Sequence, residues 1–414
     1  MNNTDSTNTR APWVIVAGGV NRLGGTDKAN FALVEYLLQK DIPVHVVAHR
    51  IDEDLLRYPT IIVDRVPVPA GSHFAGEKLL SIRGWQIAKR VTASYRSARV
   101  VVNGGNCAWG DINWVHYVHR AWSADRIEAP LTDRLKHRVA TMSAKSREIT
   151  SFRAARLVIA NSQLTRRHLI ELTNVDPNRV HTIYLGADAD WAPANQSERV
   201  TARTLLDLPS ARPIVTFVGA IGYDHRKGLD ILLKAWEQLC RLHEWDAHLV
   251  VAGDGRALPD WRSLVAHSDF HERVSFLGYT DKVRELLAAS DLLVSPARYE
   301  SFGLNVQEAL CRGVPAIVSA GVGVAEVYPA HLRDLLLRNP EDVGDLVGHM
   351  LMWRSNVEYW RNLVVESSGE LRAYSWRDMA ERFVDYATSG VIQSILPILD
   401  RDNSGSTART SAAS

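Results

Sequence analysis

Short apolar runs alternate with longer amphipathic stretches along the chain. In its first half, the runs that predict strands are 13–17, 44–48, 61–63, 100–102, 114–118 and 157–160. A helical pattern covers 27–39, and basic helical segments lie before and between the later runs. Short apolar runs that are bounded by turn residues and separated by helices are typical of a parallel sheet covered on both faces.

The second half repeats this pattern. Its predicted strands are 214–219, 248–252, 274–277, 291–295 and 316–319, and its predicted helices include 229–241, 283–289 and 304–312. Two successive arrays of this kind predict an α/β protein with two doubly wound domains. Ligands of open parallel sheets bind beyond the carboxyl ends of the strands. We therefore expect the chemistry in loops that follow strands, with the two sheets facing a cleft.

These patterns also suggest domain boundaries. We predict a first domain at 13–190, a linker of little periodicity at 191–212, and a second domain at 213–373. A helical region at 374–400 can cross back to the first domain. Residues 1–12 and the Ser/Thr/Gly-rich residues 401–414 are expected to be disordered.

Charge is unevenly distributed, although the chain has 48 basic and 47 acidic residues. Residues 1–200 hold 26 basic and 19 acidic side chains, whereas residues 201–414 hold 22 and 28. Residues 77–168 alone carry 17 basic and 6 acidic residues, in stretches that mix Lys and Arg with apolar and aromatic positions. Two interpretations stay open: packed helices with a solvated cationic side, or a docking face for anionic lipids or a lipid-linked acceptor. No nucleic-acid-binding module is recognisable, and we expect no nucleic-acid partner.

The cysteines and the apolar runs bear on the expected compartment. Cys107, Cys240 and Cys311 are far apart and have no disulfide or zinc spacing. The polar N-terminus is unlike a signal peptide, and no apolar run approaches the ~18–20 residues that span a bilayer. We expect a cytoplasmic protein, with any membrane attachment peripheral and on the inner face.

The stretch 295–326 carries the densest group of candidate site residues. Glu300 lies in a predicted loop, Gly303 allows the backbone to approach a ligand at a helix start, and Glu308 follows about one turn into the helix. The backbone N–H groups of Gly303 and Leu304 at such a helix start are suited to phosphate oxygens. Two glutamates eight residues apart are by themselves usually a surface pattern. The surrounding turn favours a site in which each glutamate binds sugar hydroxyls.

Glu300 and Glu308 form an E-x7-E element that resembles the retaining GT-B glycosyltransferases of family 4. A Gly-Val-Pro sequence at 313–315 and a glycine-rich loop extending to Glu326 follow it, as in that family. The resemblance extends over most of the chain, in the family's order. The other matching segments are AGGV at 17–20, ANS at 160–162, IYLGAD at 183–188, FVG at 217–219 with KG at 227–228, LVVAGDG at 249–255 and VSFLG at 274–278.

The resemblance implies a GT-B fold: two doubly wound Rossmann-like domains facing an interdomain cleft. A nucleotide-diphospho-sugar donor would bind the second domain and an acceptor the first. Lys227 and Arg226 would pair with the donor diphosphate, and a buried diphosphate independently needs such cations to offset its desolvation. The sequence departs from the family at Ala220, where an arginine is usual, and Arg226 is the candidate substitute. Gly25, in the glycine-rich turn of the first domain, would add a further backbone N–H.

The resemblance also implies how the reaction proceeds. Glu308 would bind the ribose, Glu300 would position the transferred sugar, and the N–H groups would stabilise the charge of the leaving group. No protein nucleophile is implied. The acceptor would attack on the face from which the leaving group departs, and the diphosphate would take its proton. Glu300 is thus a positioning residue and not a glycosidase-type nucleophile.

A histidine near the donor sugar is also implied by the resemblance. His116 and His119 lie in or just after the predicted strand 114–118. His119 is nearer to the carboxyl end of that strand and is the preferred candidate, with His116 second. A histidine in a strand is more often a packed core residue, so this assignment rests on the resemblance.

The function that follows is retaining transfer of a hexose from a nucleotide sugar to a hydroxyl acceptor, in cell-surface polysaccharide or glycolipid synthesis. The alternatives are a nucleotide-sugar epimerase on the same fold, a phosphorylase, for which no pyridoxal-phosphate lysine context is visible, and a catalytically silent binding subunit. Asp188 and Asp190 form a D-x-D pattern, but Asp188 matches the family's own segment. We expect no metal and no cofactor, because the nucleotide sugar is a substrate.

Overall fold

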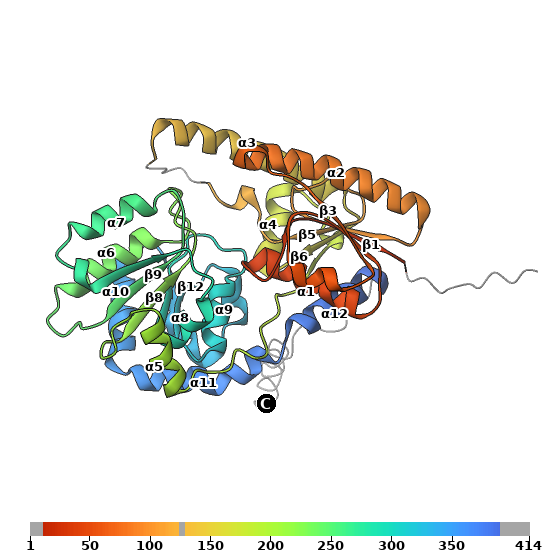
Figure 1. The fold of residues 1–414 in the computed structure, drawn as a ribbon. Helices are drawn as coiled ribbons and strands as arrows, with labels where there is room; N and C mark the ends of the chain where they lie inside the picture. The colour runs from red at the N-terminus through yellow and green to blue at the C-terminus, as the bar shows by residue number, and fades with distance from the viewer. Residues whose placement is uncertain (1–10, 124–128, 390–414) are drawn as a thin grey trace, which may run out of the picture. The chain divides into compact units, whose positions relative to one another are not determined.

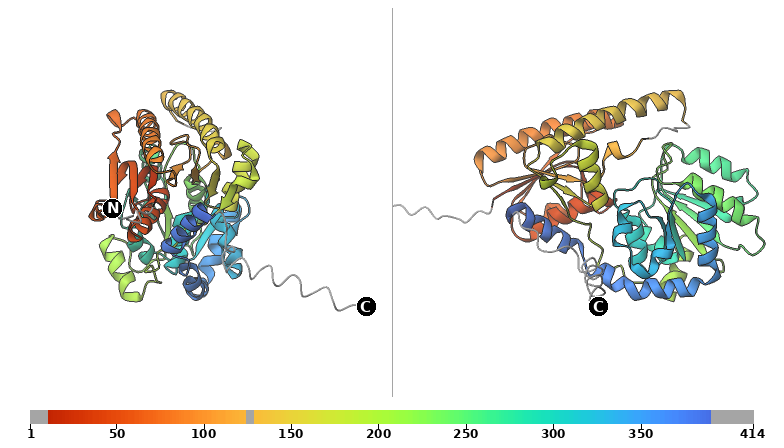
Figure 2. Two further views of the ribbon diagram at one scale, coloured as in Figure 1. Left: turned by 90° about the vertical axis from the view of Figure 1, so that its right-hand side faces the viewer. Right: turned by 180° about the vertical axis from the view of Figure 1, so that it is seen from behind.

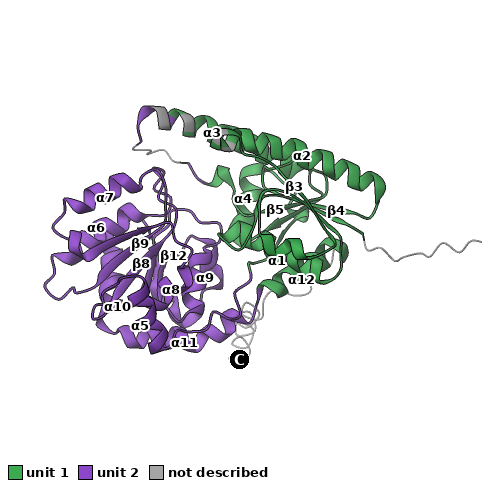
Figure 3. Ribbon diagram, in the orientation of Figure 1, with its two compact units in different colours: residues 1–121, 135–185, 376–391 green, residues 122–134, 186–375, 392–414 purple. Residues whose placement is uncertain are grey.

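A computed structural model describes residues 11–123 and 129–389 (Figure 1). Within these residues the chain forms two compact units (Figure 3). Unit 1 holds residues 11–121, 135–185 and 376–389, and unit 2 holds residues 122–123, 129–134 and 186–375. The ends predicted to be disordered lie outside the described residues, except for residues 11 and 12, which lead into the first strand.

The described part of unit 1 contains a sheet of seven parallel strands, in the spatial order β3-β2-β1-β4-β5-β6-β7. The strands are β1 (Trp13–Val20), β2 (Val44–Ile51), β3 (Ile61–Arg65), β4 (Arg99–Asn103), β5 (Ile112–Val115), β6 (Leu157–Ala160) and β7 (Val180–Thr182). The central strand β1 pairs with β2 on one side and with β4 on the other, and nearly all its side chains are buried. A continuous apolar run is therefore stable there, because helices cover both faces.

Helices cover the two faces of this sheet. They are α1 (Gly25–Gln39), α2 (His73–Ser94), α3 (Leu131–Ala154), α4 (Gln163–Thr173) and α12 (Trp376–Ser389). Helices α1 and α12 lie on one face, and α2 and α3 lie on the other (Figures 1 and 2). Phe383 of α12 packs against Trp13 and Trp114, with ring centroids 6.5 and 4.6 Å away. The last described helix of the chain therefore completes the core of its first unit.

The described part of unit 2 contains a six-stranded parallel sheet in the order β10-β9-β8-β11-β12-β13. Its strands are β8 (Ile214–Val218), β9 (His248–Ala252), β10 (Val274–Gly278), β11 (Leu292–Ser295), β12 (Ala316–Ser319) and β13 (Leu336–Leu337). Its helices are α5 (Gln196–Leu205), α6 (Leu229–Cys240), α7 (Leu258–Ala266), α8 (Val283–Ala289), α9 (Leu304–Cys311), α10 (Val343–Ser355) and α11 (Val357–Arg372). None of the helices described in either unit is long and apolar enough to cross a bilayer.

The segment 191–212, which we expected to be a linker, contains helix α5. A capping box begins this helix: the Asn195 side chain accepts the Glu198 N–H at 2.9 Å, and the Glu198 carboxylate accepts the Asn195 N–H at 3.0 Å. Arg199 and Arg203 then bind the Asp291 carboxylate, at 2.6 and 2.7 Å. These ion pairs hold the helix in place. Its sequence therefore shows little of the apolar periodicity from which helices are predicted.

Candidate functional site

The direction of chain connection reverses at the centre of the unit 2 sheet, between β8 and β11. Strands β9 and β10 extend the sheet from β8, whereas β12 and β13 extend it from β11. The loops that follow β8 and β11 therefore leave the same edge of the sheet as neighbours, which is where open α/β sheets bind ligands. The first of these loops carries Arg226 and Lys227, and the second carries Glu300.

The structure brings Arg226, Lys227 and Glu300 together. The Lys227 ammonium contacts the Glu300 Oε2 oxygen, and the Arg226 Nη1 atom lies 3.9 Å from the same oxygen. All three side chains are mostly buried. Burial, reinforced by the nearby Arg226 guanidinium, lowers the pKa of Lys227 to about 7. The Arg226 guanidinium also lies 3.6 Å from the Asp224 carboxylate. Two basic side chains held by two carboxylates in a partly desolvated loop pair give a site that can exchange these partners for an anionic ligand.

Helix α9 begins beside these side chains. Gly303 precedes the helix with a φ of 114°, and a Cβ atom there would lie 3.0 Å from Val324, so a side chain at this position is disfavoured. Among the described residues, no acceptor pairs with the backbone N–H groups of Gly303 and Leu304. Glu308 follows one turn later and is half-buried. Glu300, Gly303, Leu304 and Glu308 therefore lie within one strand-loop-helix region, next to the loop that carries Arg226 and Lys227.

Arg298, which was not predicted as a site residue, holds the loop that carries Lys227. Its guanidinium donates to both Asp230 carboxylate oxygens, at 2.7 and 2.8 Å, and to the His225 carbonyl oxygen at 2.6 Å. Its backbone N–H donates to the Arg226 carbonyl oxygen at 2.8 Å. Asp230 lies 68 residues from Arg298 along the chain, so no local sequence pattern indicates this role.

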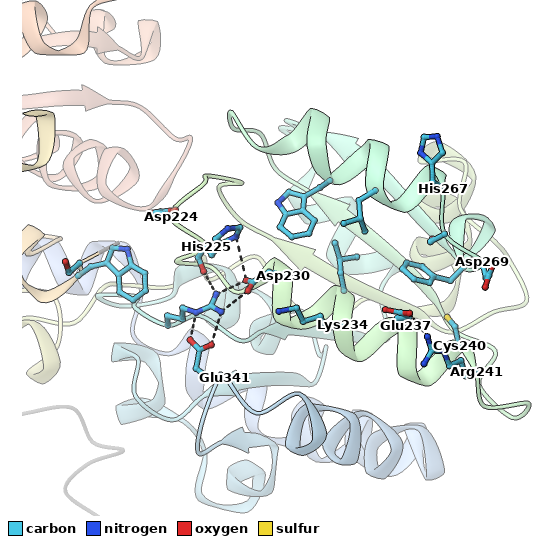
Figure 4. Close-up of a pocket in the computed structure, with 18 residues that line it drawn as sticks. Asp224, His225, Asp230, Lys234, Glu237, Cys240, Arg241, His267, Asp269 and Glu341 are labelled. Atoms are coloured by element: carbon cyan, nitrogen blue, oxygen red, sulfur yellow. Dashed lines mark hydrogen bonds and ion pairs between the residues drawn. The ribbon is translucent and has the colours of Figure 1, made fainter. Parts of the chain in front are cut away.

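A cavity of about 1290 Å³ lies next to the same loop in unit 2 (Figure 4). Asp224 and His225 of the loop contribute to its wall, together with residues of α6 and α7. Figure 4 shows the ion pairs that join Asp230 and Glu341 through the Arg298 guanidinium at one end of this cavity. The cavity therefore begins where Arg298 holds the Lys227 loop.

In unit 1, the predicted residue Gly25 is the first residue of α1 and follows β1 by a short turn. The carboxylate of Asp27, in the first turn of the helix, accepts from the Asn21 amide at 2.9 Å and from the Arg50 guanidinium at 3.2 Å. Burial raises the pKa of Asp27, and Arg50 and Asn21 oppose this rise. Gly25 thus lies at a helix N-terminus at the carboxyl edge of the unit 1 sheet.

His119 also lies in unit 1, at a short 3-10 turn after β5. The buried Glu148 of α3 accepts the His119 backbone N–H at 3.0 Å with both carboxylate oxygens, and it contacts the His119 Nδ1 atom. A carboxylate accepts hydrogen bonds, so this contact places a ring proton on Nδ1 and orients the imidazole. Glu148 was not predicted, because it lies 29 residues from His119 along the chain.

The predicted strand 114–118 is corrected to β5, Ile112–Val115. Pairing with β6 ends where Val115 meets Ala160, and the backbone then turns toward Glu148. Both histidines therefore lie after the strand and not within it. His116 is buried, and this burial lowers its pKa to about 3. Of the two, only His119 presents an exposed side chain.

The candidate residues thus form one group in unit 2 and two separate positions in unit 1, Gly25 and the His119–Glu148 pair. No group of three or more His, Cys, Asp or Glu side chains in the described parts of the chain is placed to hold a metal ion. That the protein needs no metal stays a prediction.

Two family models match the chain in succession. Residues 23–191 match "Glycosyltransferase Family 4", and residues 212–356 match "Glycosyl transferases group 1". A D-inositol 3-phosphate glycosyltransferase of Mycobacterium sp. (strain KMS) is 36% identical over 201 residues, which is 45% of this chain and 42% of that protein. An alpha-D-kanosaminyltransferase of Streptomyces kanamyceticus is 28% identical over 52% of this chain and 56% of that protein. The matched regions span about half the length of these curated relatives.

Solved structures share the fold at low sequence identity. Sucrose-phosphate synthase from Thermosynechococcus elongatus aligns with a TM-score of 0.71 at 18% identity, over 91% of this chain and 98% of that chain. The glycosyltransferase WaaG, involved in lipopolysaccharide biosynthesis, also gives 0.71, at 17% identity, over 91% of this chain and 100% of its own. Anabaena HepE, solved in complex with UDP and glucose, gives 0.66 at 16% identity, over 92% of this chain and 100% of its own.

Three observations point to the same family. They are the two parallel sheets flanked by helices, the clustered loops of unit 2, and the two family models that match the chain. The chain belongs to the family 4 (group 1) glycosyltransferases and has their GT-B fold of two Rossmann-like domains.

Proposed function

We propose that the chain is a retaining glycosyltransferase that moves a hexose from a nucleotide-diphospho-sugar to a hydroxyl acceptor. One observation carries this proposal: Arg226 and Lys227 lie beside Glu300, close to the start of α9, where the N–H groups of Gly303 and Leu304 have no acceptor among the described residues. A diphosphate needs both kinds of donor when it leaves water, and the helix N-terminus adds a favourable field.

In the proposed reaction, the bond between the anomeric carbon and the diphosphate oxygen breaks, and the acceptor oxygen bonds to that carbon on the same face. The acceptor proton passes to the departing diphosphate. Lys227, Arg226 and the N–H groups of Gly303 and Leu304 stabilise the charge that grows on this leaving group. Glu308 binds the ribose hydroxyls, and Glu300 positions the transferred hexose. These contributions need neither a metal ion nor a protein nucleophile.

His119 is assigned to the donor sugar in this proposal, with Glu148 holding its ring. The Nδ1–Glu148 contact orients the ring, and Nε2 hydrogen-bonds to a sugar hydroxyl. Gly25 contributes a backbone N–H from the start of α1. A role in cell-surface polysaccharide or glycolipid synthesis is supported by the relatives' names, which include an enzyme of lipopolysaccharide biosynthesis.

The first experiment offers the purified protein a panel of UDP-, GDP- and ADP-hexoses and follows binding and nucleotide release. We expect one donor to bind and to turn over, and Lys227→Ala to weaken its binding by roughly 10- to 100-fold, the value of a charge-assisted contact. Lys40→Gln, which changes an exposed lysine directly after α1, is the matched control and should bind as the parent does. Equal donor binding by Lys227→Ala would remove Lys227 from the site.

The same panel separates the alternatives. An epimerase converts one nucleotide sugar into another and releases no nucleotide, whereas a silent subunit binds a donor without turnover. Proton NMR of the transferred sugar distinguishes retention from inversion at the anomeric carbon. Failure of every donor to bind contradicts the transferase proposal itself.

A further inference from the structure

The side of α2 that faces away from the sheet carries large apolar side chains among lysines. Ile82 is 57% exposed, and Phe74 and Trp85 are also exposed. The Lys78 ammonium lies 4.4 Å from the centre of the Phe74 ring, and the Lys89 ammonium lies 4.9 Å from the Trp85 ring. The opposite side of the helix buries its apolar residues against the sheet, namely Leu80, Ile87 and Val91. Trp85 also contacts the Trp109 ring, with centroids 6.3 Å apart, but all three outward residues keep a large part of their surface exposed.

Helix α3 repeats this arrangement. Leu135, Val139 and Met142 follow one another at helical spacing, and each is more than half exposed. This spacing places the three side chains in a ridge along one side of the helix. Arg138 and Lys145 flank the ridge, because they lie three or four residues from its members. The buried residues of this helix, which include Ala144, Glu148 and Ser151, lie on the opposite side.

The charge of these outward sides is positive. Helices α2 and α3 together contain ten basic and three acidic residues. Of the acidic ones, Glu77 pairs with Arg147, and Glu148 is buried against the His119 backbone. Among the described residues, no carboxylate lies within ion-pair distance of four of the lysines and arginines on the outward sides: Lys78, Lys89, Arg138 and Lys145.

The two helices lie on the same face of the unit 1 sheet, where the left view of Figure 2 shows them side by side, and the Arg147–Glu77 ion pair joins them. Their outward sides therefore form one surface, which we call the outer helical surface. It combines apolar ridges, aromatic rings capped by lysines, and cations that have no ion-pair partner among the described residues.

We propose that the outer helical surface docks unit 1 on an anionic lipid membrane. Apolar side chains of an interfacial helix enter the boundary between headgroups and acyl chains, while lysine and arginine bind lipid phosphates from above it. Exposed tryptophan and phenylalanine with lysine stacked over the ring suit that boundary. A second copy of the chain is disfavoured as the occupant, because it would bring cations against cations. The docking needs no catalysis and is independent of the proposed function.

The test is flotation of the full chain with vesicles of pure phosphatidylcholine and of phosphatidylcholine mixed with phosphatidylglycerol, at low and high salt. We expect binding to the mixed vesicles at low salt and weaker binding at high salt. Each lysine near an anionic surface strengthens binding about fivefold, so the double variant Lys78→Gln/Lys89→Gln should lower the partition coefficient roughly 25-fold. Ile82→Ser/Met142→Ser should lower it at least tenfold through lost insertion.

Matched controls come from unit 2. Val200, on α5, is 56% exposed and nearly equals Ile82 in exposure, so Val200→Ser and Lys234→Gln should leave flotation unchanged. The proposal is overturned by absence of binding to mixed vesicles at low salt, by equal binding to neutral vesicles, or by controls that reduce flotation as much as the helix variants. A concentration-dependent dimer that Ile82→Ser abolishes would instead assign this surface to a second copy. Circular dichroism confirms that each variant is folded.

Discussion

His116 is a titratable side chain that the fold keeps from water. Its ring packs against Trp114, with centroids 4.6 Å apart, and burial lowers its pKa from an ordinary 6.5 to about 3. Between these two values the unfolded chain binds a proton that the folded chain does not. The free energy of unfolding of unit 1 therefore falls as the pH falls through this range.

A pH series measures this effect. Relative to His116→Gln, the parent should lose about 2 kcal/mol of unfolding free energy between pH 7.5 and pH 5.0, because the slope is about 1.4 kcal/mol per pH unit below 6.5. Urea unfolding of both proteins at the two pH values gives the difference. A constant difference between parent and variant would show that His116 takes up its proton in the folded state.

Among single residues, the sequence predicts the site residues that belong to a local motif. It does not predict the residues whose partners are distant along the chain. Glu300, Gly303 and Glu308 lie within nine residues, and the structure places them at one loop and helix start. Glu148 and Arg298 reach their partners only because the sheets bring distant segments together. Pairwise spacing along the chain carries no trace of those contacts.

Among the elements, the loops that follow β8 and β9 depend on a close approach of their backbones. Gly253, directly after β9, has a φ of 147°, and a Cβ atom there would lie 1.8 Å from the Gly219 carbonyl oxygen. The Gly219 N–H in turn donates to the Ala252 carbonyl oxygen at 3.0 Å. This packing sets the path of the chain toward Lys227.

Gly253→Ala should therefore destabilise unit 2 by roughly 3 kcal/mol or more, through backbone strain and the clash with Gly219. Gly348→Ala is the matched control: Gly348 lies within α10, and a Cβ atom there meets nothing within 4 Å. Alanine at that position should stabilise the unit by up to about 1 kcal/mol. Urea unfolding of the two variants checks both signs, and a neutral Gly253→Ala would show that the loops move apart at little cost.

Elements with strong apolar periodicity were the ones that the sequence predicted well. Most strands match or extend the predicted runs, namely β1, β2, β3, β4, β6, β9, β10 and β12, and β8 ends one residue before its predicted run does. Helix α5 was missed because arginine–aspartate pairs hold it, and β13 was missed because it is only two residues long. The end of β5 was misplaced, since apolar residues continue past Val115 after strand pairing has stopped.

In the whole molecule, unit 1 is built from segments that are not contiguous along the chain. Helix α12 belongs to unit 1, although all of 186–375 separates it from the earlier segments of that unit. The Tyr36 hydroxyl donates to the Glu381 carboxylate at 3.1 Å, and the Arg99 guanidinium donates to the Ala387 carbonyl oxygen at 3.3 Å. The stability of unit 1 therefore depends on the C-terminal part of the chain.

Phe383→Ala tests this dependence. Phe383 is fully buried between Trp13 and Trp114, so its truncation should cost unit 1 about 3–5 kcal/mol and leave the unfolding of unit 2 unchanged. Phe74→Ala removes an exposed ring from the same unit and should change stability by less than about 0.5 kcal/mol. Calorimetry of the parent and both variants separates the two units. A shift of both transitions in Phe383→Ala would contradict the assignment of α12 to unit 1.

Helix α12 also has a consequence for synthesis on the ribosome, where the chain emerges from its N-terminus. The seven strands of unit 1 leave the exit tunnel first, but Phe383 follows only after the entire unit 2 segment has been translated. During that interval the Trp13 and Trp114 rings are not packed against Phe383. The nascent first unit is therefore incomplete during this interval, and chaperones that bind exposed apolar surface can bind it then.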